Sequence, residues 1–241
     1  MSASSLPSVA HITLILALFC APVSSSERVA LVYEPALTGK TLLDELRNGG
    51  FVLYLRHAAT EHINIDRSLL KLSDCRTQRN LSAQGRAQVR EIGEAFRALR
   101  IPVSAVLTSP YCRCRDTAEL AFGEARIRPD LRFALVEDRE TTDLLGAKLR
   151  DLLSAPPPKG TNTVIVSHTA NLKEAVGIWP KPEGVTALFK PLQTGQLGYF
   201  GLVPPEDWSK LSAETRANVI GAMVRQRYGK ELEKELQSKQ Y

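Results

Sequence analysis

The strongest constraint on the fold comes from three short runs of apolar and β-branched residues. These runs cover Phe51–Leu55, Val103–Thr108 and Thr163–Val166. Runs of this length that are largely apolar are typical of strands buried on both faces of a sheet. Segments with helical periodicity separate the three runs. This alternation predicts a three-layer α/β/α sandwich with a mostly parallel central sheet.

Periodicity and stop signals place the remaining elements. We expect helices over 38–47, from the capping residue Ser82 to Pro102, over 113–122, over 143–153, from His168 onward and over 212–237. Two late strand-like stretches, 185–189 and 198–203, are expected to extend one edge of the sheet. No linker divides the chain, so residues 26–241 are expected to form a single domain.

The last expected helix is amphipathic. Its apolar residues are predicted to lie in the core or at an interface rather than on a membrane; they are Val219, Ile220, Met223 and Val224.

Residues 1–25 resemble a signal peptide. The apolar run at 9–20 is too short to span a bilayer but suits a signal-peptide core, and the small residues at 23–25 suit cleavage before Ser26. These features predict export to the periplasm or the medium, without stable membrane insertion once the leader is removed. Because no Lys or Arg precedes the apolar run, a plain N-terminal tail remains the alternative.

The charge pattern points away from nucleic acid. Lys and Arg number 31 against 26 Asp and Glu, and the excess of +5 is scattered among acidic residues. Such a surplus favours anionic substrates without forming a nucleic-acid footprint. The sequence also has no CxxC and no ladder of Cys and His, so we expect no metal site.

Polar side chains follow each of the three predicted strands. Arg56 and His57 follow the first run, Ser109 follows the second and leads to Arg113, and His168 follows the third. Ligands in open α/β sheets bind at the carboxyl ends of the strands. If the three strands are neighbours, two guanidinium groups and two imidazoles converge there. Arginine forks and a helix N-terminus suit a phosphoryl group.

The electrostatics of such a site predicts different chemical roles for the two imidazoles. Nearby positive charge lowers the pKa of a histidine, so one imidazole can stay neutral and nucleophilic near pH 7. The other can donate a hydrogen bond to the transferring phosphoryl group. The hydroxyls of Thr60 and Ser109 are candidates for the same pocket, although either could instead satisfy local backbone groups.

The long segment at 58–80 lies directly after the first histidine. Connections of this length are uncommon unless they are functional. His62, Arg76 and Arg79 in this segment, and Arg115 after it, could touch the substrate, but a solvated position is the more common outcome.

Cysteine pairing stays open at this point. An exported chain would keep three cysteines, so not all of them can pair within one molecule. A bridge from Cys75 to either Cys112 or Cys114 is conceivable, and three reduced thiols are the alternative.

Four segments together resemble the histidine phosphatase superfamily, which has the phosphoglycerate mutase-like fold. They are LRHAAT (55–60), NLSAQGRAQ (80–88), TSPYCRCRDTA (108–118) and VSHT (166–169). Each piece alone is weak, but their ordered combination is specific. The resemblance implies that His57 is the nucleophile that forms a phosphohistidine. It also implies that Arg56, Arg113 and His168 form the phosphate pocket, and that no metal or organic cofactor takes part.

The same resemblance places a proton donor between the arginine motif and the last of the three strands. The acidic residues of this segment are Glu137, Asp138 and Glu140. A donor needs a protonated carboxyl group and hence a raised pKa. Glu137 is our first choice and Asp138 our second, while solvated loop acids are the alternative.

The sequence therefore predicts a metal-independent phosphatase acting on a phosphate monoester, either a small molecule or a phosphoprotein. Two other functions share the motif set. One is a non-catalytic phosphate- or anion-binding protein of the cell envelope, and the other is phosphotransfer of the phosphoglycerate mutase type.

Overall fold

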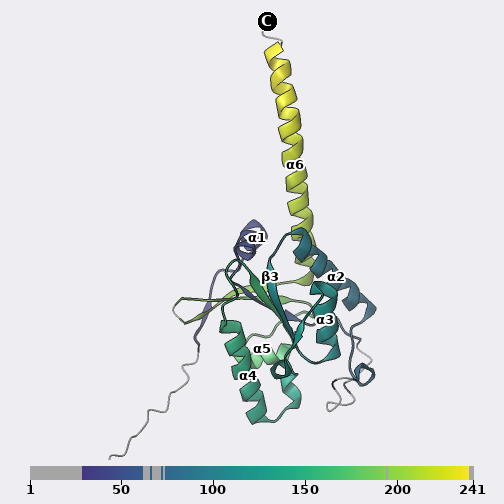
Figure 1. Ribbon diagram of the computed structural model, residues 1–241, viewed down its shortest axis with the longest axis vertical. Coiled ribbons are helices and arrows are strands. Elements are labelled where there is room, and N and C mark those ends of the chain that lie inside the picture. Colours follow the sequence, from purple (N-terminus) through teal and green to yellow (C-terminus); the bar gives the residue numbers. More distant parts are fainter. Residues whose placement is uncertain (1–28, 62–65, 67–71, 73, 194, 239–241) are drawn as a thin grey trace, which may run out of the picture.

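The computed structural model describes residues 29–61, 66, 72, 74–193 and 195–238, and its centre is a seven-stranded sheet (Figure 1). The strand order is β1-β7-β6-β2-β5-β3-β4. The strands are β1 (Leu31–Tyr33), β2 (Val52–Arg56), β3 (Val103–Thr108), β4 (Arg126–Ile127), β5 (Asn162–Ser167), β6 (Thr186–Pro191) and β7 (Leu197–Val203). The predicted strands are present, and the short β1 and β4 were not predicted.

Helices cover both faces of this sheet. They are α1 (Gly39–Asn48), α2 (Ala83–Ala98), α3 (Cys112–Phe122), α4 (Arg139–Ser154), α5 (Thr169–Val176) and α6 (Pro205–Ser238). Short 3₁₀ turns lie at η1 (Cys75–Thr77), η2 (Pro129–Leu131) and η3 (Ala134–Val136). The predicted α/β sandwich is confirmed.

Successive residues of β2 enter two separate cores, as the period of a strand requires. Leu53 and Leu55 pack with α1, α2, α3 and the start of α6 on one face. Val52 and Tyr54 pack with α4 and α5 on the other face. Burial on both faces explains why the central runs are apolar throughout.

The sheet is mixed but mostly parallel. β2, β5, β3 and β4 pair in parallel, and β1 pairs in parallel with β7. β6 is antiparallel to both β2 and β7. The two late strands therefore extend the sheet on the side of β2, as predicted, although β1 rather than β7 forms the edge itself.

Two helices begin earlier than the periodicity indicated. α4 begins at Arg139 because the side chain of Asp138 accepts a hydrogen bond from the backbone N–H of Thr141, which caps the helix. α6 begins at Pro205, a residue favoured in the first helical turn because the missing N–H is not needed there. The predicted cap at Ser82 is confirmed, since its hydroxyl accepts from the backbone N–H of Gly85.

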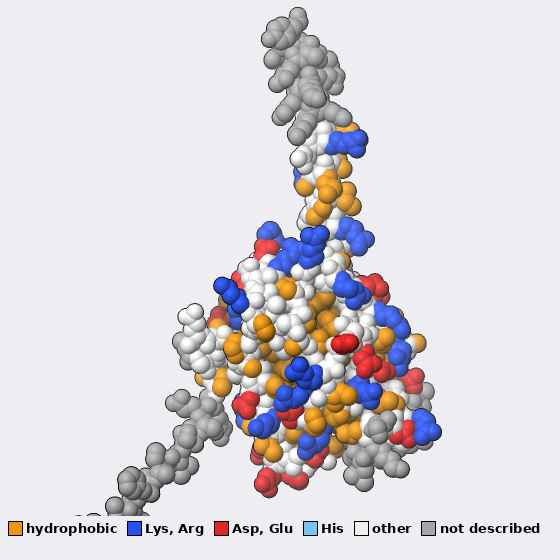
Figure 2. Space-filling model, viewed as in Figure 1, with side chains coloured by type: hydrophobic (Ala, Val, Ile, Leu, Met, Phe, Trp, Pro, Cys, Tyr) orange, Lys and Arg blue, Asp and Glu red, His pale blue; other side chains and the backbone are white. Residues whose placement is uncertain are grey.

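Most of α6 stands clear of the rest of the protein (Figure 1). Trp208 and Leu211 anchor its first turns in the core. Apolar side chains are exposed on the part that extends outward (Figure 2). The prediction that Val219, Ile220, Met223 and Val224 lie in the core is wrong, because these side chains are 47–64% exposed. Their alternative role in an interface stays a prediction.

Two predictions fall on residues outside the described ranges, namely the signal peptide at 1–25 and a substrate contact by His62. In the described part of the chain, none of the helices combines the length and apolarity that crossing a membrane requires.

Candidate active site

The three strands whose ends carry polar residues are neighbours in the sheet. β5 lies between β2 and β3, and Arg56 is paired in register with Ser167. On the other side of β5, Thr108 is in register with Val166. Because the three strands are parallel, the residues that follow them meet at the carboxyl ends of the central strands. The predicted convergence is therefore present.

His57 has one ring nitrogen engaged by the backbone. Its Nδ1 lies 3.0 Å from the carbonyl oxygen of Ala58. A carbonyl oxygen can only accept, so Nδ1 carries the proton in this contact, and the lone pair of the neutral ring is on Nε2. The backbone N–H of His57 also donates to the carbonyl oxygen of Ser167, which fixes the residue against β5. The arrangement leaves Nε2 as the ring nitrogen with an available lone pair.

His168 lies beside His57, with the two ring centroids 5.6 Å apart. The hydroxyl oxygen of Ser109 lies 2.8 Å from Nε2 of His168. The hydroxyl of Tyr54 donates to the backbone carbonyl oxygen of His168 at 2.6 Å. His168 is also the residue that precedes the first turn of α5. Both imidazoles are thus held by groups that belong to the central strands and their ends.

Three arginines surround the imidazoles; with His57 and His168 they form what we call the Arg–His cluster. Arg113 is 1% exposed, and its Nη1 donates to Asp66 at 3.0 Å. Arg56 Nη2 donates to Glu183 at 3.3 Å, and Arg79 lies 3.7 Å from the same carboxylate. The Nε atom of each of these arginines is buried without a hydrogen-bond partner among the described residues. Three unsatisfied guanidinium N–H groups are what an anion site supplies.

Burial and this positive charge keep both imidazoles neutral. The pKa of His57 lies well below 6.5, first because the ring is buried and then because Arg113 and Arg56 are close. The pKa of His168 is lowered by burial, then by Arg113 and by His57. Near neutral pH, Nε2 of His57 therefore keeps its lone pair.

Known proteins share the motifs that build this geometry. A model of the histidine phosphatase superfamily (branch 1) matches residues 52–143, which include the first three motif segments. The fourth segment, with His168, lies beyond the match and is brought to His57 by the pairing of β5 with β2.

Over residues 52–143 the chain is similar to the histidine phosphatase superfamily, branch 1.

Several solved structures also match, at low identity. One is the protein histidine phosphatase SixA complexed with tungstate, with 16% identity, 64% of this chain and 97% of that chain covered, and a TM-score of 0.43. Another is a putative alpha-ribazole-5'-P phosphatase from Escherichia coli, with 15% identity, 66% and 98% covered, and a TM-score of 0.49. A third is phosphoglycerate mutase from Thermus thermophilus, with 19% identity, 64% and 98% covered, and a TM-score of 0.44. None of the curated proteins matches this chain.

The motif at 80–88 holds the loop that follows His57. Gln88 accepts a hydrogen bond from the backbone N–H of Ala59 at 3.2 Å. A Cβ at Gly85 would lie 1.9 Å from the carbonyl oxygen of Ala59, so only glycine allows α2 to approach so closely. The N-terminal end of α2 therefore packs directly on the loop that follows His57.

Thr117 in the third motif joins the same loop to α3. Its hydroxyl oxygen accepts from the backbone N–H of Ala58 at 3.1 Å and donates to the carbonyl oxygen of Arg113 at 2.6 Å. A single side chain thus links the loop after His57 to the backbone of the buried Arg113.

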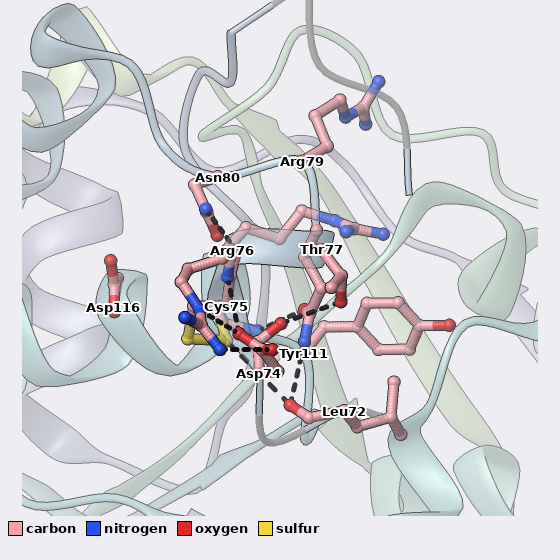
Figure 3. Close-up of a disulfide and its surroundings, with 12 residues drawn as sticks. Leu72, Asp74, Cys75, Arg76, Thr77, Arg79, Asn80, Tyr111 and Asp116 are labelled. Carbon is pink, nitrogen blue, oxygen red and sulfur yellow. Dashed lines mark hydrogen bonds and ion pairs between the residues drawn. A yellow bond between two sulfur atoms is a disulfide. The ribbon is translucent and has the colours of Figure 1, made fainter. Parts of the chain in front are cut away.

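A disulfide ties the segment after His57 to the start of α3 (Figure 3). Of the two pairings left open by the sequence, the structure contains Cys75–Cys112, and Cys114 is a buried thiol. Gln78, three residues after Cys75, accepts a hydrogen bond from the backbone N–H of Cys112 at 2.9 Å. Because Arg113 is the next residue, the disulfide constrains the turn that carries this arginine.

The two candidate hydroxyls differ in their contact with the cluster, since Thr60 reaches it through Glu183 whereas Ser109 contacts its member His168 directly. The hydroxyl and the backbone N–H of Thr60 donate to Glu183, each at 3.0 Å. The hydroxyl of Ser109 contacts His168 as described above. A direct contact of either hydroxyl with a substrate stays a prediction.

The three candidate proton donors have separate positions. Glu137 accepts a hydrogen bond from Arg132 at 2.6 Å, and its charge acts on Tyr111, whose ring packs on His168. Asp138 caps α4, and the hydrogen bond from the backbone of Thr141 lowers its pKa. Glu140 is exposed in the first turn of α4. Of the three, Glu137 is the one whose charge acts on a residue that packs against His168, and its role as donor stays a prediction.

The sequence analysis missed four residues at the site, namely Asp66, Tyr111, Phe133 and Glu183, and it named Arg79 only as a secondary candidate for which a solvated position was the more common outcome. Arg79 directly precedes the NLSAQGRAQ motif, and that position was the available signal for it. Tyr111 and Phe133 pack against His168 with centroids 5.0 and 5.1 Å away. No sequence signal marked Glu183 or Asp66. Arg76, by contrast, is 90% exposed and pairs with Asp74, the solvated outcome (Figure 3).

Metal ligands do not gather anywhere in the described residues: no group of three His, Cys, Asp or Glu is placed to hold an ion.

The neutral, buried state of the two imidazoles makes stability depend on pH. Below about 6.5 the unfolded chain binds protons at both positions while the folded protein does not, so stability falls as the pH falls. We expect the free energy of unfolding to fall progressively as the pH is lowered from about 6.5, with each of the two histidines contributing to the slope. Urea denaturation in phosphate-free buffer measures it, and a His168→Gln variant should lose about half of the slope. A wild-type slope equal to that of the variant would contradict neutral imidazoles.

Proposed function

We propose that this protein is a metal-independent phosphomonoesterase that works through a phosphohistidine at His57. The observation that carries the proposal is the neutral His57, fixed with its proton on Nδ1, beside three arginines whose buried Nε–H groups have no partner among the described residues. The substrate class is a phosphate monoester, on a small molecule or on a protein.

The proposed first step transfers the phosphoryl group to the ring. Arg56, Arg79 and Arg113 bind the phosphate oxygens, and the lone pair of His57 Nε2 attacks phosphorus. The ester P–O bond breaks, and the leaving oxygen takes a proton from a donor. His168, steadied by Ser109, stabilises the transferring group.

The second step releases inorganic phosphate. Water attacks phosphorus, the P–N bond breaks, and the proton of the water passes to solvent or to the donor of the first step. The ring returns to its neutral form with the proton still on Nδ1. Atoms and charge balance without a metal or an organic cofactor.

Hydrolysis of p-nitrophenyl phosphate in EDTA by the protein lacking residues 1–25 tests this proposal. We expect EDTA-resistant turnover that falls by at least about 10³-fold in His57→Ala, since that variant lacks the nucleophile. Glu140→Gln is the matched control and should keep wild-type activity. Equal turnover by His57→Ala would contradict the mechanism, and phosphate binding without turnover would favour the anion-binding alternative.

We propose Glu137 as the proton donor, supported by its position near Tyr111 beside His168. A poor leaving group needs a proton, whereas p-nitrophenolate leaves without one. Glu137→Gln should therefore lower kcat/KM for an alkyl phosphate such as glycerol 2-phosphate by about 10²-fold and change p-nitrophenyl phosphate hydrolysis little. Equal losses on both substrates, or no loss on either, would show that Glu137 is not the donor. Asp66→Asn is the next variant to compare.

We also propose that the protein is exported to the periplasm or the medium after loss of residues 1–25. The Cys75–Cys112 disulfide supports this, because disulfides persist in oxidising compartments. Mature protein from its natural source should begin near Ser26 and, when denatured without reductant, show one titratable thiol, that of Cys114. Three thiols, or an intact N-terminus, would contradict export.

A further inference from the structure

Glu183 is the one carboxylate that the turn before β6 delivers to the Arg–His cluster. The backbone N–H of the next residue, Gly184, donates to the carbonyl oxygen of His57 at 3.0 Å. Gly184 has a φ of +83°, and a Cβ there would lie 2.6 Å from the side chain of Gln88. This hydrogen bond fixes the turn to the backbone of His57, and it thereby fixes the position of Glu183 as well.

The carboxylate of Glu183 is held entirely by donors. One oxygen accepts from the backbone N–H of Thr60 at 3.0 Å. The other accepts from the Thr60 hydroxyl at 3.0 Å and from Arg56 at 3.3 Å, and Arg79 lies 3.7 Å away. The side chain is only 15% exposed. Three hydrogen bonds from donors suit an ionised carboxylate and leave no oxygen assigned to protonating a leaving group.

Its place relative to His57 also separates it from the reacting nitrogen. Oε1 of Glu183 lies 3.9 Å from Nδ1 of His57, the nitrogen whose proton points to Ala58. Nε2, which carries the lone pair, is the other nitrogen of the ring. Glu183 thus faces the side of the imidazole that keeps its proton throughout the reaction.

Phosphorylation of the His57 ring creates a positive charge that a nearby carboxylate can offset. Once Nε2 bonds to phosphorus while Nδ1 keeps its proton, the imidazole ring carries a positive charge. That charge develops beside Arg56 from β2, Arg79 from the segment before α2, and Arg113 from α3, each of which opposes it. Asp66 offsets Arg113 by a direct hydrogen bond. Among the described residues, Glu183 supplies the carboxylate that lies within 4 Å of the His57 ring.

We propose that Glu183 is a positioning residue that offsets the positive charge of the phosphorylated His57 ring. This inference rests on the proposed function. The role is distinct from that of the proton donor, because Glu183 acts through His57 and forms no bond with the substrate. A negative charge here weakens the attraction of the cluster for free phosphate while it favours the phosphorylated ring.

The opposite effects of this charge on phosphate binding and on ring phosphorylation can be measured separately, and a merely structural role would not produce them. In Glu183→Gln the negative charge is lost at nearly constant size, so phosphorylation of His57 should slow, whereas inorganic phosphate should bind as tightly as before or more tightly. Disorder of the cluster would instead weaken both. Glu183→Asp keeps the charge and should recover part of the phosphorylation rate.

The experiment is single-turnover release of p-nitrophenol with enzyme in excess, which reports the first step alone, together with the inhibition constant of inorganic phosphate. We expect Glu183→Gln to lower the rate constant by at least about tenfold, with a phosphate inhibition constant equal to or below that of the wild type. Glu174→Gln is the matched control, because Glu174 is 19% exposed and pairs with Arg139 instead. It should match the wild type in both measurements.

The outcomes separate the two proposals. A wild type that turns over in EDTA, with Glu183→Gln equally fast, overturns the role of Glu183 and leaves the proposed function standing. A slower variant that also binds phosphate more weakly assigns Glu183 a structural role and overturns the charge argument. A wild type without turnover overturns the proposed function, and this inference with it.

Discussion

Crowding of positive charge at one edge of the sheet is the constraint on which the rest of this structure depends. Arg56, Arg79 and Arg113 all act on the two imidazoles, and all three guanidinium groups are near one another in a largely buried place. Like charges at such distances repel, and burial strengthens the effect. This positive charge lowers the pKa of His57 and His168 and keeps both rings neutral. Two carboxylates offset the arginines: Asp66 pairs with Arg113, and Glu183 lies beside Arg56 and Arg79. The same crowding is what a dianionic phosphoryl group would relieve.

The scaffold resists this repulsion through many short-range connections to the backbone. α2 packs on the loop after His57 through a glycine, one threonine hydroxyl joins that loop to α3, and a disulfide holds the start of α3. Each of these connections comes from a motif segment or from the segment between two motifs. The motifs therefore encode the support of the site as much as its reacting groups. These contacts stabilise the folded arrangement in which the three guanidinium groups stay close together despite their mutual repulsion.

Much of the fold, and the site residues that follow the central strands, could be predicted from the sequence. Buried parallel strands are apolar on both faces, so β2, β3 and β5 were recognisable, and the residues at their ends were expected to meet. Glu183 could not be found this way, because its place depends on a turn anchored to the backbone of His57. The outward course of α6 was also hidden, since exposed apolar residues such as Met223 have the same pattern as buried ones. Local patterns predict elements, whereas turns and helix directions depend on contacts distant in sequence.

The central claim is that His57 becomes covalently phosphorylated, and trapping of that intermediate tests it most directly. The leaderless protein would be mixed with a ³²P-labelled phosphate monoester in EDTA, quenched in alkali during turnover and digested for peptide mapping. The account predicts a label that is stable in alkali, lost in acid and confined to the peptide that contains His57. Turnover without such a label, or a label on another residue, would contradict it.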